Sequence, residues 1–184
     1  MIIRPAEIRD LDSILDIYNE AVLNTVATFD TEPRDISQHR VWFEHHGERH
    51  PVFIAEEDGV VTGWASLSAW SDRRAYDDTA EISLYVRSDR RGMGIGKALM
   101  RGVVETGRAQ GLHTIIARIA GGNEVSIRLH RSAGFEHIGV MREVGLKFGR
   151  RIDVHMMQLI YDAKASIAEI LCTPRQEGEQ SGIR

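Results

Sequence analysis

The sequence has little cysteine and no long apolar run. Cys172 is the only thiol among 184 residues, which excludes an internal disulfide and fits a reducing cytoplasm. A membrane-spanning helix needs about 20 apolar residues in succession, and no run approaches that length. The first residues, Met1-Ile2-Ile3-Arg4, lack a signal-peptide pattern. We therefore expect a cytoplasmic protein without membrane contact.

Positive charge is also scarce over the chain as a whole. The 23 Lys and Arg residues are outnumbered by 27 Asp and Glu, and the net charge of −4 argues against nucleic acid as a partner. The histidines show no ligand spacing, so no metal site is expected. The length suits one domain with a sizeable core. We expect that domain at 1–165, followed by a partly disordered C-terminal extension at 166–184.

Hydrophobic periodicity predicts an α+β fold around a mixed sheet. Helices are expected at 9–22, 35–48, 98–109 and 123–134. Strands are expected at 2–4, 52–55, 60–70, 79–86, 114–119, 135–143 and 153–159. Polar loops are expected at 24–33 and 71–78.

A glycine-rich stretch, Arg91-Gly92-Met93-Gly94-Ile95-Gly96-Lys97, lies between a predicted strand and a predicted helix. Uncovered backbone N–H groups at a helix N-terminus bind phosphate, and we expect the ligand here to be a diphosphate. A P-loop is disfavoured because Ala98 replaces the hydroxyl that binds Mg²⁺. A dinucleotide fingerprint is disfavoured because Lys97 replaces the third glycine. A purely structural turn remains an alternative.

Two motifs carry a resemblance to a known family. Arg91-x-x-Gly94-x-Gly96 resembles the [QR]-x-x-G-x-[GA] signature of GNAT N-acetyltransferases, whose loop wraps the pyrophosphate of acetyl-CoA. Asn123-x-x-Ser126-x-x-Leu129-His130-x-x-x-Gly134-Phe135 resembles a second element of that family. The resemblance implies an α/β sandwich, with a mixed, mostly antiparallel sheet splayed around an acyl-CoA slot and flanked by helices. It also implies a β-bulge near 82–84.

The same resemblance implies which residues bind acetyl-CoA as co-substrate. They are Leu84, Tyr85, Val86, Arg91, Gly92, Met93, Gly94, Ile95, Gly96, Lys97, Asn123 and Ser126. It further implies that Glu81 acts as general base, through a water; the alternative is a buried structural carboxylate paired with an arginine. His130 is implied either as the general acid that protonates the CoA thiolate or as a packing residue beside CoA.

Three further segments resemble the phosphinothricin/methionine sulfoximine N-acetyltransferases within that family: Thr28-Phe29-Asp30-x-x-Pro33, Arg73-x-x-Tyr76-x-x-Thr79-x-Glu81 and Gly145-x-Lys147-Phe148-Gly149-Arg150-x-x-Asp153. This resemblance covers roughly residues 1–162. It implies a homodimer that acetylates the α-amino group of L-amino acids with a tetrahedral polar head, an activity tied to herbicide or antibiotic resistance. The implied substrate-binding residues are Phe29, Arg73, Arg74, Tyr76, Thr79, Lys147 and Phe148.

Two other functions remain open from the residues themselves. The acceptor can be another small amine, such as an aminoglycoside, or a protein N-terminus. The chain can also be a CoA-binding module that has lost catalysis. The basic residues near the expected substrate side favour an anionic substrate over a polycationic aminoglycoside.

Overall fold

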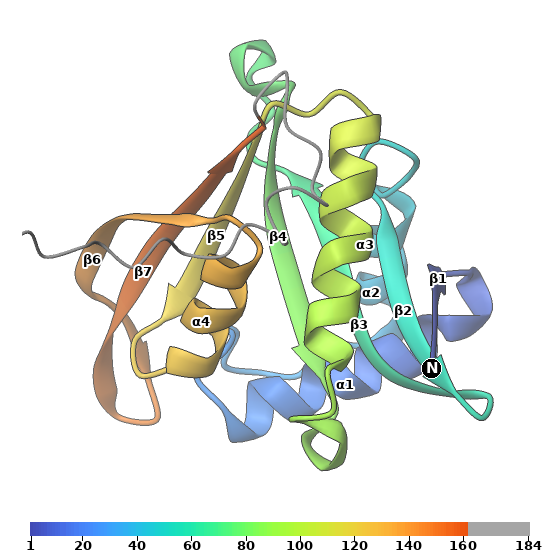
Figure 1. The fold of residues 1–184 in the computed structure, drawn as a ribbon. Coiled ribbons are helices and arrows are strands. Elements are labelled where there is room, and N and C mark those ends of the chain that lie inside the picture. Colours follow the sequence, from blue (N-terminus) through green and yellow to red (C-terminus); the bar gives the residue numbers. More distant parts are fainter. Residues whose placement is uncertain (162–184) are drawn as a thin grey trace, which may run out of the picture.

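The computed structural model describes residues 1–161 and shows a central sheet between two helical layers (Figure 1). The strands are β1 (Ile2–Pro5), β2 (Val52–Glu57), β3 (Val60–Ala69), β4 (Thr79–Val86), β5 (Thr114–Ala120), β6 (Glu136–Lys147) and β7 (Arg150–Ile160). The helices are α1 (Leu11–Asn24), α2 (Ile36–Glu44), α3 (Ile95–Ala109) and α4 (Glu124–Ser132), with short 3₁₀ turns at Ile8–Asp10, Arg74–Tyr76 and Ser88–Arg90. The predicted α+β class is confirmed.

Some expectations concern residues 162–184 and lie outside the described residues. They are the domain boundary at 165 and the partly disordered extension at 166–184. Among residues 1–161, no helix is long and apolar enough to cross a membrane.

Several predicted elements differ in length from the observed ones. The helix predicted to reach 48 ends at Glu44, and the last two strands extend into one long hairpin. That hairpin turns at Phe148 and Gly149, whose φ angles are 51° and 72°. Two successive residues with positive φ form the tight turn that matches strand twist, so β6 and β7 stay paired up to it.

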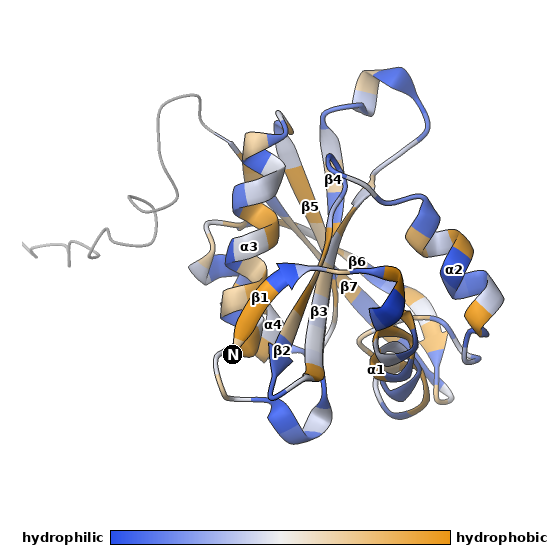
Figure 2. Cartoon of the chain, turned by 90° about the vertical axis from the view of Figure 1, so that its right-hand side faces the viewer, coloured by the Kyte–Doolittle hydropathy of each residue, from blue (hydrophilic) through white to orange (hydrophobic). Residues whose placement is uncertain are grey.

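The two helical layers bury separate clusters against opposite faces of the sheet (Figure 2). On one face α3 contributes Leu99 and Val103, both fully buried, and α4 contributes Ile127. On the other face α1 contributes Ile14 and Val22. Both helices place apolar residues three or four positions apart, which gives each one buried stripe.

The strand order is β1-β2-β3-β4-β5-β7-β6, and β4 with β5 is the parallel pair. These two strands pair only from Thr79–Glu81 to Thr114–Ile116. Beyond Glu81 they diverge, while β5 continues alongside β7 over its whole length (Figure 1). The predicted splayed sheet is therefore confirmed.

The predicted β-bulge at 82–84 is wrong. The register between β3 and β4 runs without a shift from Ala69–Ala80 to Gly63–Val86. The divergence instead arises because β5 follows β7, and β4 keeps its regular pairing to β3. The backbone groups of β4 that face β5 are consequently left without a strand partner after Glu81.

Candidate active site

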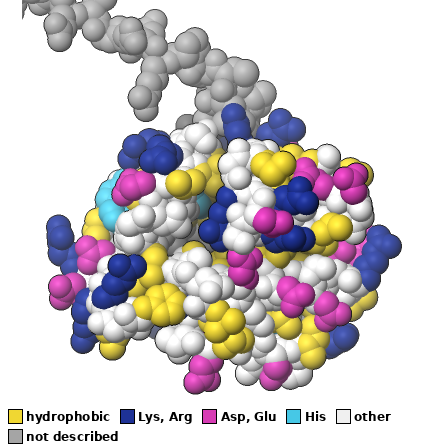
Figure 3. All heavy atoms as spheres, turned by 90° about the horizontal axis from the view of Figure 1, so that it is seen from below, with side chains coloured by type: hydrophobic (Ala, Val, Ile, Leu, Met, Phe, Trp, Pro, Cys, Tyr) yellow, Lys and Arg dark blue, Asp and Glu magenta, His cyan; other side chains and the backbone are white. Residues whose placement is uncertain are grey.

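A pocket of about 500 Å³ lies where β4 and β5 diverge. Its walls come from α1, α2, β3, β4, β5, α4, the β6–β7 pair and the segment 26–34. Seen from the diverging end, the surface of the molecule is hollowed, with basic and acidic side chains around it (Figure 3). The predicted site residues among its lining are Phe29, Glu81, Leu84, Tyr85, Asn123, Ser126 and His130.

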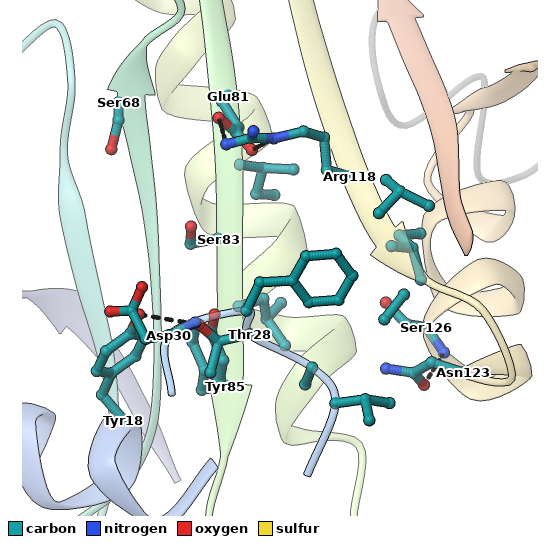
Figure 4. A pocket seen from close by; sticks show the side chains of 18 of the residues that line it. Tyr18, Thr28, Asp30, Ser68, Glu81, Ser83, Tyr85, Arg118, Asn123 and Ser126 are labelled. Carbon is teal, nitrogen blue, oxygen red and sulfur yellow. Dashed lines mark hydrogen bonds and ion pairs between the residues drawn. The ribbon is translucent and has the colours of Figure 1, made fainter. Parts of the chain in front are cut away.

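Alternation along β4 places Glu81, Ser83 and Tyr85 on one face of the sheet, toward the pocket (Figure 4). Glu81 forms a bidentate ion pair with Arg118 of β5. The guanidinium Nε lies 2.5 Å from one carboxylate oxygen and Nη2 lies 2.7 Å from the other. The side chain of Glu81 is 21% exposed and that of Arg118 is 53% exposed. Sequence reasoning did not single out Arg118, which looks like an ordinary polar residue within a strand.

The glycine loop follows the end of β4 and forms the start of α3. Gly92 and Gly94 have φ angles of 80° and 83°, and Gly94 is the N-cap of the helix. The first N–H groups of a helix have no acceptor within the helix, so those of Ile95, Gly96 and Lys97 can bind an anion. Arg91 and Met93, also predicted to bind the diphosphate, precede the same helix. Nε of Arg91 donates to the carbonyl of Val86 at 3.3 Å, and the side chain of Met93 is exposed.

Gly96 also permits close packing. A Cβ there would lie 3.3 Å from Cδ2 of Leu129 on α4 and 3.6 Å from Cδ2 of Leu84 on β4. The first turn of α3 therefore lies against the end of β4 and against α4, close to the strand whose inner backbone is unpaired.

The three residues predicted from the second motif lie along α4: Asn123 is its N-cap, Ser126 is in its first turn and His130 is in its last turn. The side chain of Asn123 caps the helix by accepting from the N–H of Ser126 at 3.2 Å. Nδ1 of His130 donates to the carbonyl of Ser126 at 2.8 Å, and its ring meets Phe135 edge to face. Burial lowers the pKa of His130 below its ordinary value, although the bond to Ser126 opposes this. His130 is therefore a neutral imidazole that carries its proton on Nδ1.

The segment 26–34 covers one side of the pocket and is held by α1. Tyr18 donates its hydroxyl to Asp30 at 2.7 Å and lies 3.0 Å from the hydroxyl of Thr28. Arg34 donates to the same carboxylate of Asp30 at 2.8 Å. Burial raises the pKa of Tyr18 to about 12, so its hydroxyl stays protonated. Sequence reasoning placed Tyr18 only on the buried stripe of its helix, and the Thr28–Asp30 motif gave no hint of this network.

Lys147 anchors the same segment from the opposite side. Its ammonium donates to the carbonyl of Thr28 at 2.9 Å, and the residue is only 3% exposed. Burial lowers the pKa of Lys147. Two positions earlier, Gly145 lies under the ring of Phe29, closer than any side chain at 145 would allow. Lys147 is not among the pocket-lining residues, and neither is Phe148, which is 59% exposed.

A cluster of aromatic side chains from α1, α2 and β3 forms part of the pocket lining. His39 of α2 is 1% exposed and stacks between Tyr18 and Trp42, and Trp64 of β3 lies beside them. Within residues 1–161, neither ring nitrogen of His39 has a hydrogen-bond partner, nor does Nε1 of Trp64. Burial lowers the pKa of His39 to about 4. Sequence reasoning did not place His39 or Trp64 in the site. The spacing of His39 and Trp42, three positions apart on α2, was the available signal.

The remaining predicted substrate residues lie away from the pocket. Arg73, Arg74 and Tyr76 belong to the exposed turn between β3 and β4, and Thr79 is paired with Thr114 in the sheet. None of them lines the pocket. Among the described residues, no group of three or more His, Cys, Asp or Glu side chains is arranged to hold a metal ion.

Known proteins are similar to this chain in sequence and fold. The family model described as "Acetyltransferase (GNAT) domain" matches residues 3–156. An L-methionine sulfoximine/L-methionine sulfone acetyltransferase of Pseudomonas aeruginosa is 43% identical over 166 residues, which cover 89% of this chain and 96% of that protein.

Two solved structures extend the comparison. A phosphinothricin acetyltransferase from Sinorhizobium meliloti, in complex with acetyl-CoA, has a TM-score of 0.84 and 38% identity, covering 97% of this chain and 95% of the other. A ribosomal-protein-alanine N-acetyltransferase from Brucella melitensis has a TM-score of 0.85 and 40% identity, covering 88% and 100%.

Proposed function

Because this chain belongs to the GNAT acetyltransferase family, we propose that it transfers an acetyl group from acetyl-CoA to the α-amino group of L-amino acids with a tetrahedral polar head. Methionine sulfone, methionine sulfoximine and phosphinothricin are the substrates that the relatives' names suggest. The observation that carries the proposal is the position of Glu81. Its carboxylate lies on the pocket wall where β4 leaves β5, in reach of both the open strand edge and the pocket.

The donor site is proposed at the start of α3 and along β4. The free N–H groups after Gly94, together with Arg91 and Lys97, suit the diphosphate of acetyl-CoA. The unpaired backbone of β4 beyond Glu81 offers hydrogen bonds to an extended amide-containing chain, and Asn123 and Ser126 line the opposite wall. Acetyl-CoA supplies an acyl group already activated as a thioester. The protein's tasks are to position the amine, polarise the carbonyl and remove a proton.

Glu81 is the proposed general base. An α-amino group has a pKa near ~8, so a positioned carboxylate, acting through a water, needs to give only mild assistance. Both of its oxygens accept hydrogen bonds from Arg118. One of them must be released before Glu81 can accept a proton.

His130 suits a packing role better than that of general acid. A neutral imidazole that donates from Nδ1 to Ser126 has no proton on Nε2 to give to a thiolate, and burial makes the cationic form less stable. We therefore expect His130→Phe to keep most of kcat, with the edge-to-face contact to Phe135 replaced by a similar aromatic contact.

The aromatic part of the pocket lining supports a substrate with an oxygen-rich head. Trp64 has a buried N–H without an acceptor among the described residues, and such an orphaned donor is costly unless a ligand or water satisfies it. A sulfone, sulfoximine or phosphinate oxygen is a suitable acceptor. The apolar faces of Tyr18, Trp42 and Tyr85 would contact the methylene and methyl groups.

We propose that the active form is a homodimer joined along β6 and that it works in the cytoplasm, where acetyl-CoA is abundant. β6 is an edge strand of the sheet, and several apolar side chains on it and on its hairpin are more than half exposed: Ile138, Val144, Leu146 and Phe148. Such an edge favours pairing with a second copy. Light scattering after size-exclusion chromatography should give the mass of a dimer, and a monomer at micromolar concentration would contradict the proposal.

The function is tested with purified protein, acetyl-CoA and a panel of acceptors, following the release of free thiol. The panel contains methionine sulfone, methionine sulfoximine, phosphinothricin, an aminoglycoside and a peptide with an N-terminal alanine. We expect turnover of the amino acids with a polar head. Turnover of the alanine peptide alone would instead support the activity named for the Brucella protein. CoA binding without turnover of any acceptor would support a silent module.

A further inference from the structure

The cations that line the pocket are not the arginines expected from the sequence. Among the lining residues, the positively charged side chains are Arg34 and Arg118. Arg34 is bound to Asp30 and lies over the ring of Tyr18, 4.9 Å from its centre. Arg118 is bound to Glu81 at the point where β4 and β5 separate.

Arg118 has capacity for a second anion. Its two bonds to Glu81 use Nε and Nη2, and within residues 1–161 Nη1 has no hydrogen-bond partner. A guanidinium carries five N–H donors in a planar fork, which allows it to hold two carboxylates at once or to exchange one for another. The side chain is 53% exposed, so it can move without disturbing the core, and it reaches across the opening to β4 (Figure 4).

The ion pair is partly open to solvent. The side chain of Arg118 is 53% exposed and that of Glu81 is 21% exposed, so water and other anions can compete for the guanidinium. The guanidinium of Arg118 also lies 5.9 Å from the centre of the Trp70 ring. A cation–π contact with this ring can stabilise the guanidinium when it turns away from Glu81. An incoming anion of suitable geometry can therefore displace Glu81 from part of the fork.

An α-amino acid presents this combination of charges. Its ammonium and its carboxylate are attached to the same carbon, so they can face Glu81 and Arg118 together. The carboxylate would take N–H groups of Arg118 and the ammonium would approach the freed oxygen of Glu81. An amine without a carboxylate does not displace Arg118, so both oxygens of Glu81 stay bound in the ion pair.

We propose that Arg118 is the residue that selects α-amino acids, by binding the substrate carboxylate and thereby releasing Glu81 to act on the amine. This inference rests on the proposed function and deepens it. It moves carboxylate recognition from Arg73 and Arg74, which are exposed and outside the pocket, to a residue of β5 that already contacts the proposed base.

The test compares two acceptors that differ only in the carboxylate. They are methionine sulfone and its decarboxylated analogue, 3-(methylsulfonyl)propan-1-amine, each assayed for kcat/KM by thiol release at saturating acetyl-CoA. The wild-type chain should prefer the amino acid. Arg118→Met should lower kcat/KM for the amino acid by roughly 10- to 100-fold, the loss of one charge-assisted contact. The same variant should leave the decarboxylated amine unchanged or faster, so that the preference disappears.

Two comparison variants separate this role from others. Arg101→Met removes an exposed arginine of α3 that pairs only within its own helix, and it should keep the wild-type preference. The double variant Arg73→Met/Arg74→Met should also keep it. Thermal unfolding of each variant shows that the fold is retained.

Several results would overturn the proposal. An equal loss for both acceptors in Arg118→Met would mean that Arg118 only holds Glu81 in place. A preference that survives in Arg118→Met and disappears in the double variant would assign the carboxylate to the 73–74 turn. Turnover of neither acceptor by the wild-type chain, with turnover of the alanine peptide, would refute the proposed function and the role of Arg118 with it.

Discussion

Lys147 donates its ammonium to the backbone carbonyl of Thr28 at 2.9 Å, although the two residues are 119 positions apart in the chain. This bond ties the β6–β7 hairpin to the segment 26–34, which forms one wall of the pocket. A buried ammonium held by a neutral carbonyl is costly, so its place in the structure favours a positioning role for that wall over a role in stability.

The contact between Gly145 and Phe29 gives a direct test of that wall. A Cβ at position 145 would overlap the ring of Phe29, so Gly145→Ala must displace the ring. We expect kcat/KM for the amine to fall on the order of 10- to 100-fold, because a small misplacement of the acceptor is enough. Gly139→Ala on the same strand meets no atom within 4 Å and serves as the matched control. Equal activity of the two variants would show that the segment 26–34 does not position the substrate.

Glu81→Gln tests the proposed base. The amide keeps the size of the side chain but cannot take a proton, so kcat should fall by roughly 10²- to 10⁴-fold. The affinity for CoA, measured by calorimetry, should stay the same because Glu81 lies apart from the α3 start. Glu105→Gln, on the exposed face of α3, is the control for loss of a carboxylate. An unchanged kcat near neutral pH would contradict the assignment.

Gly94→Ala tests the donor site. Gly94 has a φ of 83°, which costs a residue with a side chain about 1–2 kcal/mol and tilts the N–H groups at the start of α3. KM for acetyl-CoA should rise on the order of tenfold, while KM for the amine changes little. Gly47→Ala, which meets no atom within 4 Å and has no positive φ, is the control. A rise in KM for the amine alone would contradict the proposal that this loop binds acetyl-CoA.

The buried imidazole of His39 predicts a pH dependence of stability. Its pKa is about 4 in the folded chain, compared with 6.5 for an unperturbed group, so the unfolded chain binds a proton where the folded chain does not. Stability is therefore lost as the pH falls below about 6.5, and the loss is complete below about 4.

At pH 5 the loss in the free energy of unfolding that comes from His39 amounts to about 2 kcal/mol. Chemical unfolding at pH 7.5 and pH 5 should show that the wild-type chain loses about this much more than His39→Phe, which keeps the stacking with Trp42. Because other histidines are present in both proteins, the difference isolates position 39. An identical loss in the two proteins would show that His39 is not the titrating group.

The sequence alone predicted much of the fold, but the site only in part. Alternation and helical periodicity are local signals, and they located every strand and helix to within a few residues. They did not predict that β6 and β7 extend to a two-residue turn. Phe148 has a positive φ there, and a phenylalanine gives no sign of that conformation in the sequence. The bulge expected in β4 is absent because divergence depends on which neighbour β5 follows, and strand pairing is a long-range choice.

By itself, the sequence determined the residues proposed for the donor side of the site. The glycines at 92, 94 and 96 and the Asn123 to Phe135 element are contiguous in the chain, so their spacing carries their geometry. The residues proposed for the acceptor side come together only in the tertiary structure. Arg118 meets Glu81 across 37 positions and Lys147 meets Thr28 across 119, and side chains so distant in sequence come together only because the sheet opens between β4 and β5.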